Sequence, residues 1–416
     1  MPVTDATPGP PLLTPLSALD CLVVGRRTSL FADDLSRARS QVDEVFRGAR
    51  ILVIGGGGSV GSSTVRLLLQ LQPAAVHVVD VSENYLAELV RDVRSSVRGV
   101  AAVDFRTLPL DYGSGVMRRF LADADPYAIV LNFAALKHVR SEKDVYSVLQ
   151  MLDTNVVKHA RFKSWLRENG HGARYFAVST DKAANPSSLM GASKRLMEDV
   201  AFDFSVPDAG HRTSARFANV AFSNGSLLQS FLIRLEKRQP LAAPGGTSRY
   251  FITLGEAGEI CVLAAAAMPD GHLAVPMLAP ETDLQSLVEI ATKVLWHFNN
   301  RAVAYDDEAA AQRDLETLAA RNEWPLVVTP LDTSGEKPYE TFVGDGEFAV
   351  DVGLAALQGI RRAESTQFDN DFMIALERAI DQWSSQVAKS DLVTLLSSRF
   401  PSFRHVETGK NLDQRI

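Results

Sequence analysis

The sequence predicts a doubly wound α/β fold, with a parallel sheet in the first half and a smaller α/β domain in the second. Two observations predict the sheet: short β-rich apolar runs alternate with longer amphipathic stretches from residue 50 onward, and a glycine-rich turn follows the first run. Strands that are apolar on both faces and separated by helices form parallel sheets covered on both sides. A third observation predicts the second domain, because this alternation loosens after about residue 218.

Each strand of the sheet is expected where an apolar run occurs, at 50–54, 76–79, 103–107, 129–131 and 175–178. The changes of pattern predict four regions. They are an N-terminal arm at 1–48, a cofactor-binding domain at 49–218 that is completed by helices from later segments, a substrate-binding domain at 219–370 and a helical tail at 371–416. The arm is expected to become helical after a proline-rich tip, because its apolar residues recur at helical spacing.

The composition excludes several classes of protein. Of the 416 residues, 46% are hydrophobic and 22% are charged, as in an ordinary globular protein, and the net charge of −7 gives the surface no general attraction for nucleic acid. Cys21 and Cys261 are far apart and have no ligand-spaced neighbours, so we expect two buried thiols and no metal site. Without a signal-peptide pattern or an apolar run of ~18 residues for a membrane span, we expect a cytoplasmic protein that acts on small molecules.

The glycine-rich turn at 55–61, GGGGSVG, joins the first expected strand to an amphipathic helix. Glycines let the chain turn tightly and let a pyrophosphate approach the N–H groups at the helix start. Asp80 ends the second strand 19 residues after Gly61, where a carboxylate binds ribose hydroxyls and repels a 2′-phosphate. This predicts a Rossmann-type site for NAD rather than NADP. The expected contacts are Gly55, Gly58, Ser59, Val60, Gly61, Asp80, Asp111, Tyr112, Ala134 and Ala135.

Polar residues follow the fifth strand at 179–186, where the ligand crevice of an open α/β sheet lies. Around them seven motifs stand in order: GGGGSVGS, NFAALKHV, VSTDKAANP, MGASK, RFANVAFSNGS, SRYFIT and SGEK. Through these motifs, residues 50–340 resemble the extended short-chain dehydrogenase/reductases. Within that family, they resemble the nucleotide-sugar 4,6-dehydratases of bacterial polysaccharide biosynthesis, especially the UDP-N-acetylglucosamine type. One departure is Met190, which stands where the family's Tyr-x-x-x-Lys motif usually has tyrosine and where a subset of the family has Met.

The resemblance implies a reaction that needs an acid and a base beside the cofactor. A hydride leaves C4 for NAD, water is lost across C5 and C6, and the hydride returns to C6. Adjacent Asp181 and Lys182 supply the pair, and the resemblance makes Asp181 the acid at the 6-hydroxyl and Lys182 the base. A basic Lys182 needs a lowered pKa, which a cationic Lys194 would favour while it binds the nicotinamide ribose. The predicted catalytic set is Thr180, which would orient the 4-hydroxyl, with Asp181, Lys182, Met190 and Lys194. Since Met cannot accept a proton, the base for the 4-hydroxyl is left open.

Five further residues are expected to contact the nucleotide sugar. Lys137 follows the fourth strand and suits a sugar or a phosphate, with His138 beside it as a further contact. The resemblance adds Asn219, Arg249 and Glu336, of which the planar arginine suits a diphosphate. It also gives Asn155 a positional role, as the residue that braces the active-site helix.

Two other functions compete with the dehydratase. A 4-epimerase would share oxidation at C4 but needs no acid at C6, so the Asp181–Lys182 pair disfavours it. A catalytically inactive cofactor-binding scaffold is suggested by Met190 but does not explain why Asp181, Lys182 and Lys194 occur together. The family also predicts a homo-oligomer, in which helices at 143–168 and 189–205 would pair with a second copy.

Overall fold

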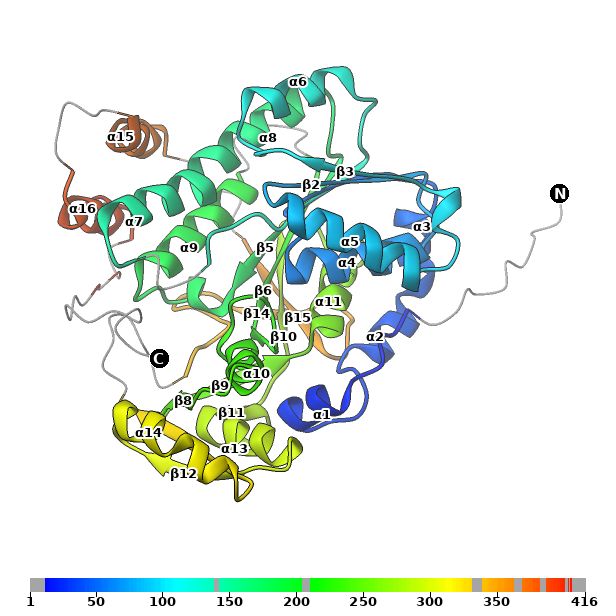
Figure 1. Cartoon of the computed structure of the whole chain (residues 1–416). Coiled ribbons are helices and arrows are strands. Elements are labelled where there is room, and N and C mark those ends of the chain that lie inside the picture. Colours follow the sequence, from blue (N-terminus) through cyan, green and yellow to red (C-terminus); the bar gives the residue numbers. More distant parts are fainter. Residues whose placement is uncertain are drawn as a thin grey trace.

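The computed structural model describes residues 12–137, 142–203, 210–330, 339–362, 369–381, 387–400, 403 and 405. Its centre is a nine-stranded sheet with the order β14-β15-β10-β6-β5-β4-β1-β2-β3 (Figure 1). Neighbouring strands from β10 to β3 are parallel, and β15 and β14 extend that sheet in antiparallel fashion. The bounds are β1 Arg50–Ile54, β2 Ala75–Asp80, β3 Asp104–Pro109, β4 Ile129–Asn132, β5 Arg174–Thr180, β6 His211–Phe217, β10 His272–Pro276, β14 Ala349–Asp351 and β15 Leu357–Arg361. The predicted doubly wound fold is confirmed.

Helices cover both faces of this sheet. On one face lie α4 (Ser59–Gln70), α5 (Glu83–Ser96) and α11 (Leu254–Ala266), and on the other lie α6 (Gly115–Asp123), α8 (Lys158–Glu168) and α9 (Leu189–Ala201) (Figure 1). The π-helical turn η3 (Asp153–Val157) joins α7 (Val145–Leu152) to α8, and the short turns η1 (Val100–Ala102) and η4 (Asp181–Ala183) complete this half.

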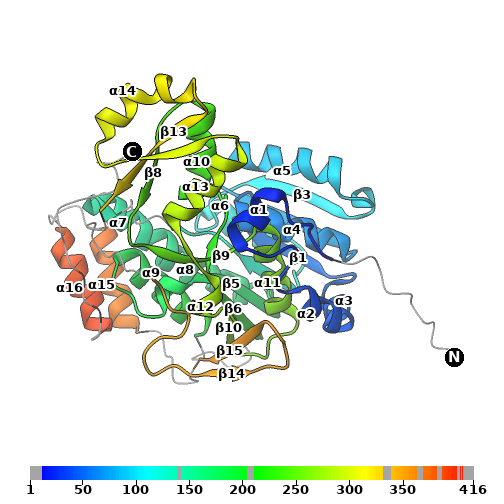
Figure 2. The same ribbon diagram turned by 90° about the horizontal axis from the view of Figure 1, so that it is seen from below.

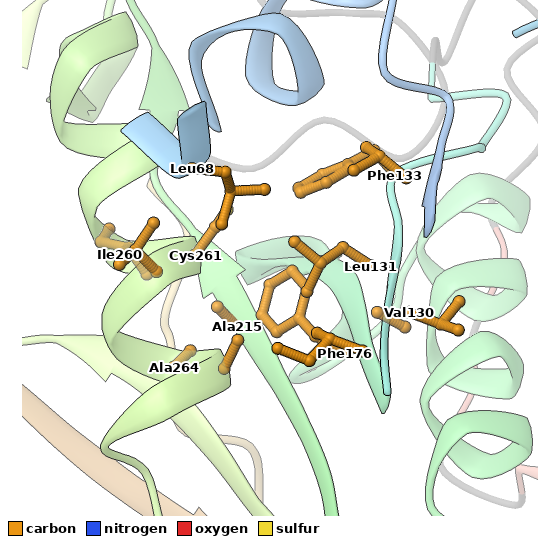
Figure 3. Packing of buried hydrophobic residues seen from close by; sticks show 14 of the residues in the cluster. Leu68, Val130, Leu131, Phe133, Phe176, Ala215, Ile260, Cys261 and Ala264 are labelled. Carbon is orange, nitrogen blue, oxygen red and sulfur yellow. The ribbon is translucent and has the colours of Figure 1, made fainter. Parts of the chain in front are cut away.

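The main core lies on both faces of the sheet, and part of it lies between the sheet and α11. Figure 3 shows Leu131 and Phe176 of the strands together with Ile260, Cys261 and Ala264 of the helix, and these side chains are all buried. Cys261 therefore fits the expected buried thiol. Cys21 does not, because it is only half-buried on the N-terminal arm.

The second half of the chain is divided between two places. Strands β10, β14 and β15 belong to the main sheet although they follow residue 218, and the predicted domain boundaries stay predictions. Other strands after residue 218 form two small three-stranded sheets, β12-β13-β8 and β11-β9-β7, next to a separate apolar cluster. The elements are β7 Asn219–Val220, α10 Leu227–Glu236, β8 Leu241–Pro244, β9 Ser248–Ile252, α12 Pro280–Asp283, β11 Leu284–Ser286, α13 Leu287–His297, β12 Arg301–Tyr305, α14 Glu308–Ala319 and β13 Glu323–Thr329.

The helices of the N-terminal arm and the last two helices pack on the α/β body (Figure 2). The arm forms α1 (Ala18–Val24), α2 (Ala32–Arg37) and α3 (Arg39–Phe46), and Arg26 binds Glu256 of α11 at 2.7 Å. At the other end, α15 (Asn370–Asp381) and α16 (Lys389–Arg399) lie against the α7 and α9 side. Within the described residues, no helix is long and apolar enough to cross a membrane.

Candidate active site

The glycine turn has little room for side chains where it meets β4. Gly55 has a φ of +71°, and a Cβ added there would lie 2.6 Å from the backbone nitrogen of Ala134. A Cβ on Gly61 would lie 2.5 Å from the Gly55 carbonyl oxygen. Gly58 caps the start of α4, and its Cβ would meet only the Gly55 oxygen, at 3.4 Å. The turn therefore holds the positive end of α4 against the carboxyl ends of β1 and β4, with space at Gly58 for a ligand.

Asp80 lies directly beside this turn. Its Oδ2 accepts a hydrogen bond from the Gly57 N–H at 3.0 Å, and its Oδ1 accepts one from the Ser82 N–H at 2.9 Å. These two bonds fix the carboxylate at the end of β2, where it can accept further bonds from ribose hydroxyls. The turn and the carboxylate together fit the adenosine diphosphate part of a dinucleotide.

The other predicted cofactor residues have different surroundings. Ala134 and Ala135 follow β4 and are half-buried, and their small side chains leave room for a ligand to approach the backbone. Tyr112 is buried, and its hydroxyl donates to the Thr154 carbonyl, so this side chain is engaged with η3. Asp111 binds Lys158 at 2.6 Å. Ser59 and its neighbour Val60 were predicted as cofactor contacts. Ser59 Oγ accepts a hydrogen bond from the Asn224 N–H at 2.8 Å, which links the turn to the second half of the chain.

Asn155 makes the contacts of a bracing residue. Its Oδ1 accepts from the Leu136 N–H at 2.8 Å, and its Nδ2 donates to the Leu136 carbonyl at 2.9 Å and to Ser193 Oγ at 3.0 Å. One buried amide thus joins the segment after β4 to helix α9.

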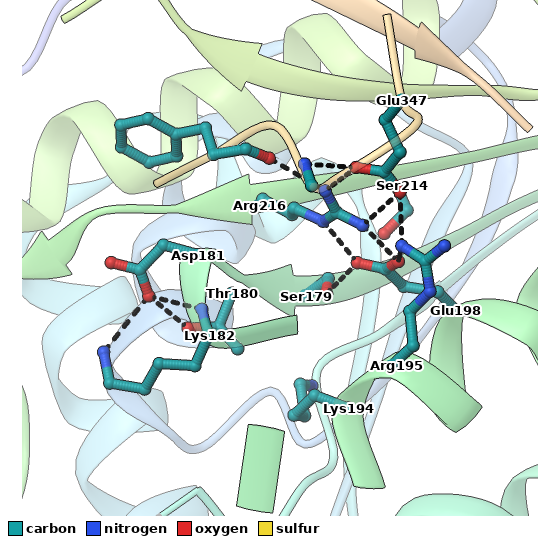
Figure 4. A network of polar contacts seen from close by, with 12 residues as sticks. Ser179, Thr180, Asp181, Lys182, Lys194, Arg195, Glu198, Ser214, Arg216 and Glu347 are labelled. Carbon is teal, nitrogen blue, oxygen red and sulfur yellow. Dashed lines mark hydrogen bonds and ion pairs between the residues drawn. The ribbon is translucent and has the colours of Figure 1, made fainter. Parts of the chain in front are cut away.

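Thr180, Asp181 and Lys182 meet at the carboxyl end of β5 (Figure 4). Asp181 is 2% exposed, and its Oδ1 accepts from Thr180 Oγ1 at 2.8 Å, from the Lys182 N–H at 2.8 Å and from Lys182 Nζ at 3.1 Å. Among the described residues, no donor binds Oδ2. The pair is therefore a buried carboxylate with one free oxygen, next to a partly exposed ammonium.

Lys194 does not join this pair. Its Nζ donates to the Val178 carbonyl at 2.8 Å and contacts Met197 Sδ at 3.1 Å. Burial lowers the pKa of Lys194 to about 7, since the nearby Glu198 only partly compensates. The described residues show no bond between Lys194 and the Asp181–Lys182 pair, and the predicted role of Lys194 stays a prediction.

Met190 belongs to an apolar cluster and is 2% exposed. Its N–H donates to Glu142 Oε1 at 3.0 Å. This contact between Glu142 and the start of α9 was not predicted. The only signal in the sequence is that Glu142 lies five residues after Lys137, which was predicted to contact the substrate. Position 190 supplies packing to the active-site helix, and its side chain moves no proton.

The predicted substrate residues lie partly within the described chain. Asn219 pairs in register with Phe251, and Arg249 stands two residues before Phe251, so both side chains belong to one face of the β11-β9-β7 sheet. Arg249 donates to the Ser248 carbonyl at 2.9 Å, and Lys137 is exposed. His138 and Glu336 lie outside the described residues.

A second charged cluster lies behind the site and was not predicted. Arg216 is fully buried and binds Glu198 Oε1 and Oε2 at 2.8 Å each, and Glu347 Oε1 at 2.9 Å (Figure 4). Burial raises the pKa of Glu347, but the hydrogen bond from Arg216 and the charges of Arg216 and Arg195 outweigh it and lower that pKa to about 2. Ser179 joins the cluster by donating to Glu198 Oε1 at 2.6 Å.

The fold and the site define an extended short-chain dehydrogenase/reductase, as the motifs predicted. The model of the family described as "Polysaccharide biosynthesis protein" matches residues 51–350, and the chain belongs to that family.

Individual relatives agree with this membership. The chain is 30% identical over 236 residues to the capsular polysaccharide biosynthesis protein CapD of Staphylococcus aureus, covering 54% of this chain but only 37% of that protein. It is 27% identical over 260 residues to an inverting UDP-N-acetylglucosamine 4,6-dehydratase of Campylobacter jejuni, covering 61% of this chain and 74% of that one.

Solved structures share the fold. The X-ray structure of Pen from Bacillus thuringiensis is 20% identical with a TM-score of 0.62, and the match covers 85% of this chain and 98% of that one. The Bordetella bronchiseptica enzyme WbmF, solved in complex with NAD+ and UDP, is 19% identical with a TM-score of 0.51, and the match covers 66% and 88%.

Proposed function

We propose that this chain is an NAD-dependent nucleotide-sugar 4,6-dehydratase that converts UDP-N-acetylglucosamine into a UDP-4-keto-6-deoxy-hexosamine for polysaccharide biosynthesis. The observation that carries the proposal is the Thr180–Asp181–Lys182 group at the carboxyl end of β5, two strands away from the glycine turn in the same sheet. Relatives named as UDP-N-acetylglucosamine 4,6-dehydratases and as capsular polysaccharide proteins support it.

NAD is the cofactor that suits the residues present. Gly55, Gly58 and Gly61 would accept its pyrophosphate, and Asp80 its adenosine ribose. When bound, NAD supplies a hydride acceptor at C4 and returns the hydride to C6. The NAD+ and UDP bound by WbmF support the same pair of ligands here.

The Asp181–Lys182 ion pair can perform both proton transfers of the elimination. Movement of one proton from Lys182 Nζ to Asp181, along the 3.1 Å bond between them, converts the ion pair into an amine and a carboxylic acid. The amine then takes the proton from C5, and the acid gives its proton to the departing 6-hydroxyl, which leaves as water. These two transfers restore the starting charges of the pair. When the hydride returns to C6, the Lys182 ammonium would give a proton back to C5, and the proton released from the 4-hydroxyl during the oxidation would replace it on Lys182.

The substrate diphosphate would lie between the two halves of the chain. Arg249 and Asn219 share one face of the small sheet, and Lys137 follows β4, so these side chains would bind the diphosphate and the sugar.

The test is incubation with UDP-N-acetylglucosamine in heavy water. We expect a product lighter by one water, with one deuteron at C5 and no net consumption of NAD. A 4-epimerase would isomerise the sugar without loss of water and without deuterium at C5. Unchanged sugar across UDP, GDP, dTDP and CDP substrates would overturn the proposal and favour the inactive scaffold.

A further inference from the structure

The C-terminal helices α15 and α16 cover an apolar face of the catalytic half of the chain. That face is built by buried residues of α7, η3 and α9. Helices α15 and α16, called the C-terminal hairpin below, contribute buried residues to the same apolar cluster (Figure 1). The face consists of Val148, Met151, Leu152, Val156, Val157, Leu189, Met190, Leu196 and Val200, and the hairpin and the segment after it add Phe372, Leu376, Leu392, Leu396 and Phe403.

Charged contacts fix the hairpin in one place on this face. Asp199 of α9 is 3% exposed and binds Arg399 of α16 at 3.0 Å and Arg362, which follows β15, at 2.5 Å. At the other end of α9, burial raises the pKa of Glu142, and the charges of His405 and Lys389 in the C-terminal segment act in the opposite direction. An apolar centre bordered by a buried ion pair is typical of a specific interface.

Without α15 and α16, the part of this cluster that Phe372, Leu376, Leu392, Leu396 and Phe403 cover would be exposed. Monomeric proteins rarely expose such patches, and two copies would bury them by pairing face to face around a twofold axis. We propose that the C-terminal hairpin occupies this face within its own chain and thereby takes the place of a second copy. The homo-oligomer expected from the family stays a prediction, and any such assembly would use another surface.

A cross-linking experiment on the full chain distinguishes a hairpin bound in cis from one bound in trans. The variant with both Asp199→Cys and Arg399→Cys is treated with a short bismaleimide, alongside an equal mixture of the two single variants. We expect a cross-linked single chain from the double variant and no cross-linked dimer from the mixture. A dimer from the mixture, which can form only between chains, would overturn the proposal. Each single variant alone controls for reaction at Cys21.

A second measurement tests whether two copies of the chain associate through this face once the hairpin has left it. In Leu392→Asp/Leu396→Asp, two buried positions of α16 become charged, so the hairpin should leave the face. We expect the mass from light scattering to increase with concentration and roughly double, as pairing about a twofold axis requires. Thr394→Asp/Ser398→Asp has the same charges and spacing at exposed positions of α16 and should keep the parent mass. A folded Leu392→Asp/Leu396→Asp variant with the parent mass would contradict the proposal, and if that variant does not fold, the cross-linking result decides.

Discussion

Two charged groups stand at the end of β5, and they differ in how completely they are bonded. Ser179 and Thr180 are consecutive residues, so their side chains point to opposite faces of the sheet. Ser179 bonds to the Glu198–Arg216–Glu347 cluster, whereas Thr180 bonds to the Asp181–Lys182 pair (Figure 4). Both groups contain a buried carboxylate and a cation.

The difference between them separates a structural role from a chemical one. In the cluster, both oxygens of Glu198 accept from Arg216, and both oxygens of Glu347 accept from basic side chains. In the pair, all donors reach one oxygen of Asp181, and none of the described residues donates to the other. The second oxygen of Asp181 is not among the buried side-chain atoms that lack a partner, so it is open to solvent and a ligand could bond to it.

Removing a member of the incomplete pair should produce the largest effect on activity. Lys182→Met keeps the length of the side chain and deletes the base, so we expect turnover to fall by about 10²- to 10⁴-fold. The free energy of unfolding should fall less than for removal of Arg216, since Lys182 is partly exposed and Asp181 keeps its bonds from Thr180 and from the Lys182 N–H. Steady-state kinetics with parallel urea unfolding measures both. A loss of stability without a loss of turnover would reverse the assignment of the two groups.

Removing the centre of the complete cluster should instead reduce stability. Arg216→Met leaves Glu198 and Glu347 buried without their main partner, which costs about 3–5 kcal/mol of unfolding free energy. The exposed pair of Arg238 and Glu316 at 2.6 Å is the matched control, and Arg238→Met should be indistinguishable from the parent protein. Equal urea midpoints for the two variants would show that the cluster is not a stabilising element.

The cluster also predicts a loss of stability in acid. The pKa of Glu347 is lowered to about 2 in the folded protein from an ordinary value of 4.5. Its contribution, about 3 kcal/mol at most, is fully present above pH 4.5 and is lost as the pH falls from there toward 2. Urea unfolding of the parent and of Glu347→Gln at several pH values tests this. The variant should be less stable near pH 7, and the difference should shrink below pH 4.5; a constant difference would exclude the linkage.

The sequence predicted what depends on local pattern. Apolar runs located β1 to β5, and the glycine spacing located the turn, because strand periodicity and the backbone freedom of residues such as Gly55 are properties of short segments. The same holds for Asp181 and Lys182, which are adjacent in the chain. The cofactor and substrate contacts assigned to individual residues stay predictions.

The features that the sequence did not predict depend on long-range packing. Arg216 and Glu347 are 131 residues apart and meet only because β15 rejoins the sheet through β10, next to β6. The Lys194 ammonium donates to the Val178 carbonyl, which belongs to a different element of the fold. The residue pattern of a helix does not tell which partner outside that helix a side chain will bind. Met190 is buried partly because the last helices of the chain return to α9.

The smallest expected effects come from Ser179 and Thr180, two neighbouring residues whose side chains belong to the two different groups. Ser179→Ala removes one hydrogen bond to the Glu198 carboxylate and should cost about 1–2 kcal/mol of unfolding free energy, with turnover nearly unchanged. Thr180→Val removes the 2.8 Å bond to Asp181 at nearly constant volume and should lower turnover by about tenfold, since one hydrogen bond to a charged group contributes about 1.5 kcal/mol or more. Urea midpoints and turnover for both variants form a two-by-two comparison. If both lose stability and keep turnover, the Asp181–Lys182 group is structural as well, and other residues must carry out the chemistry.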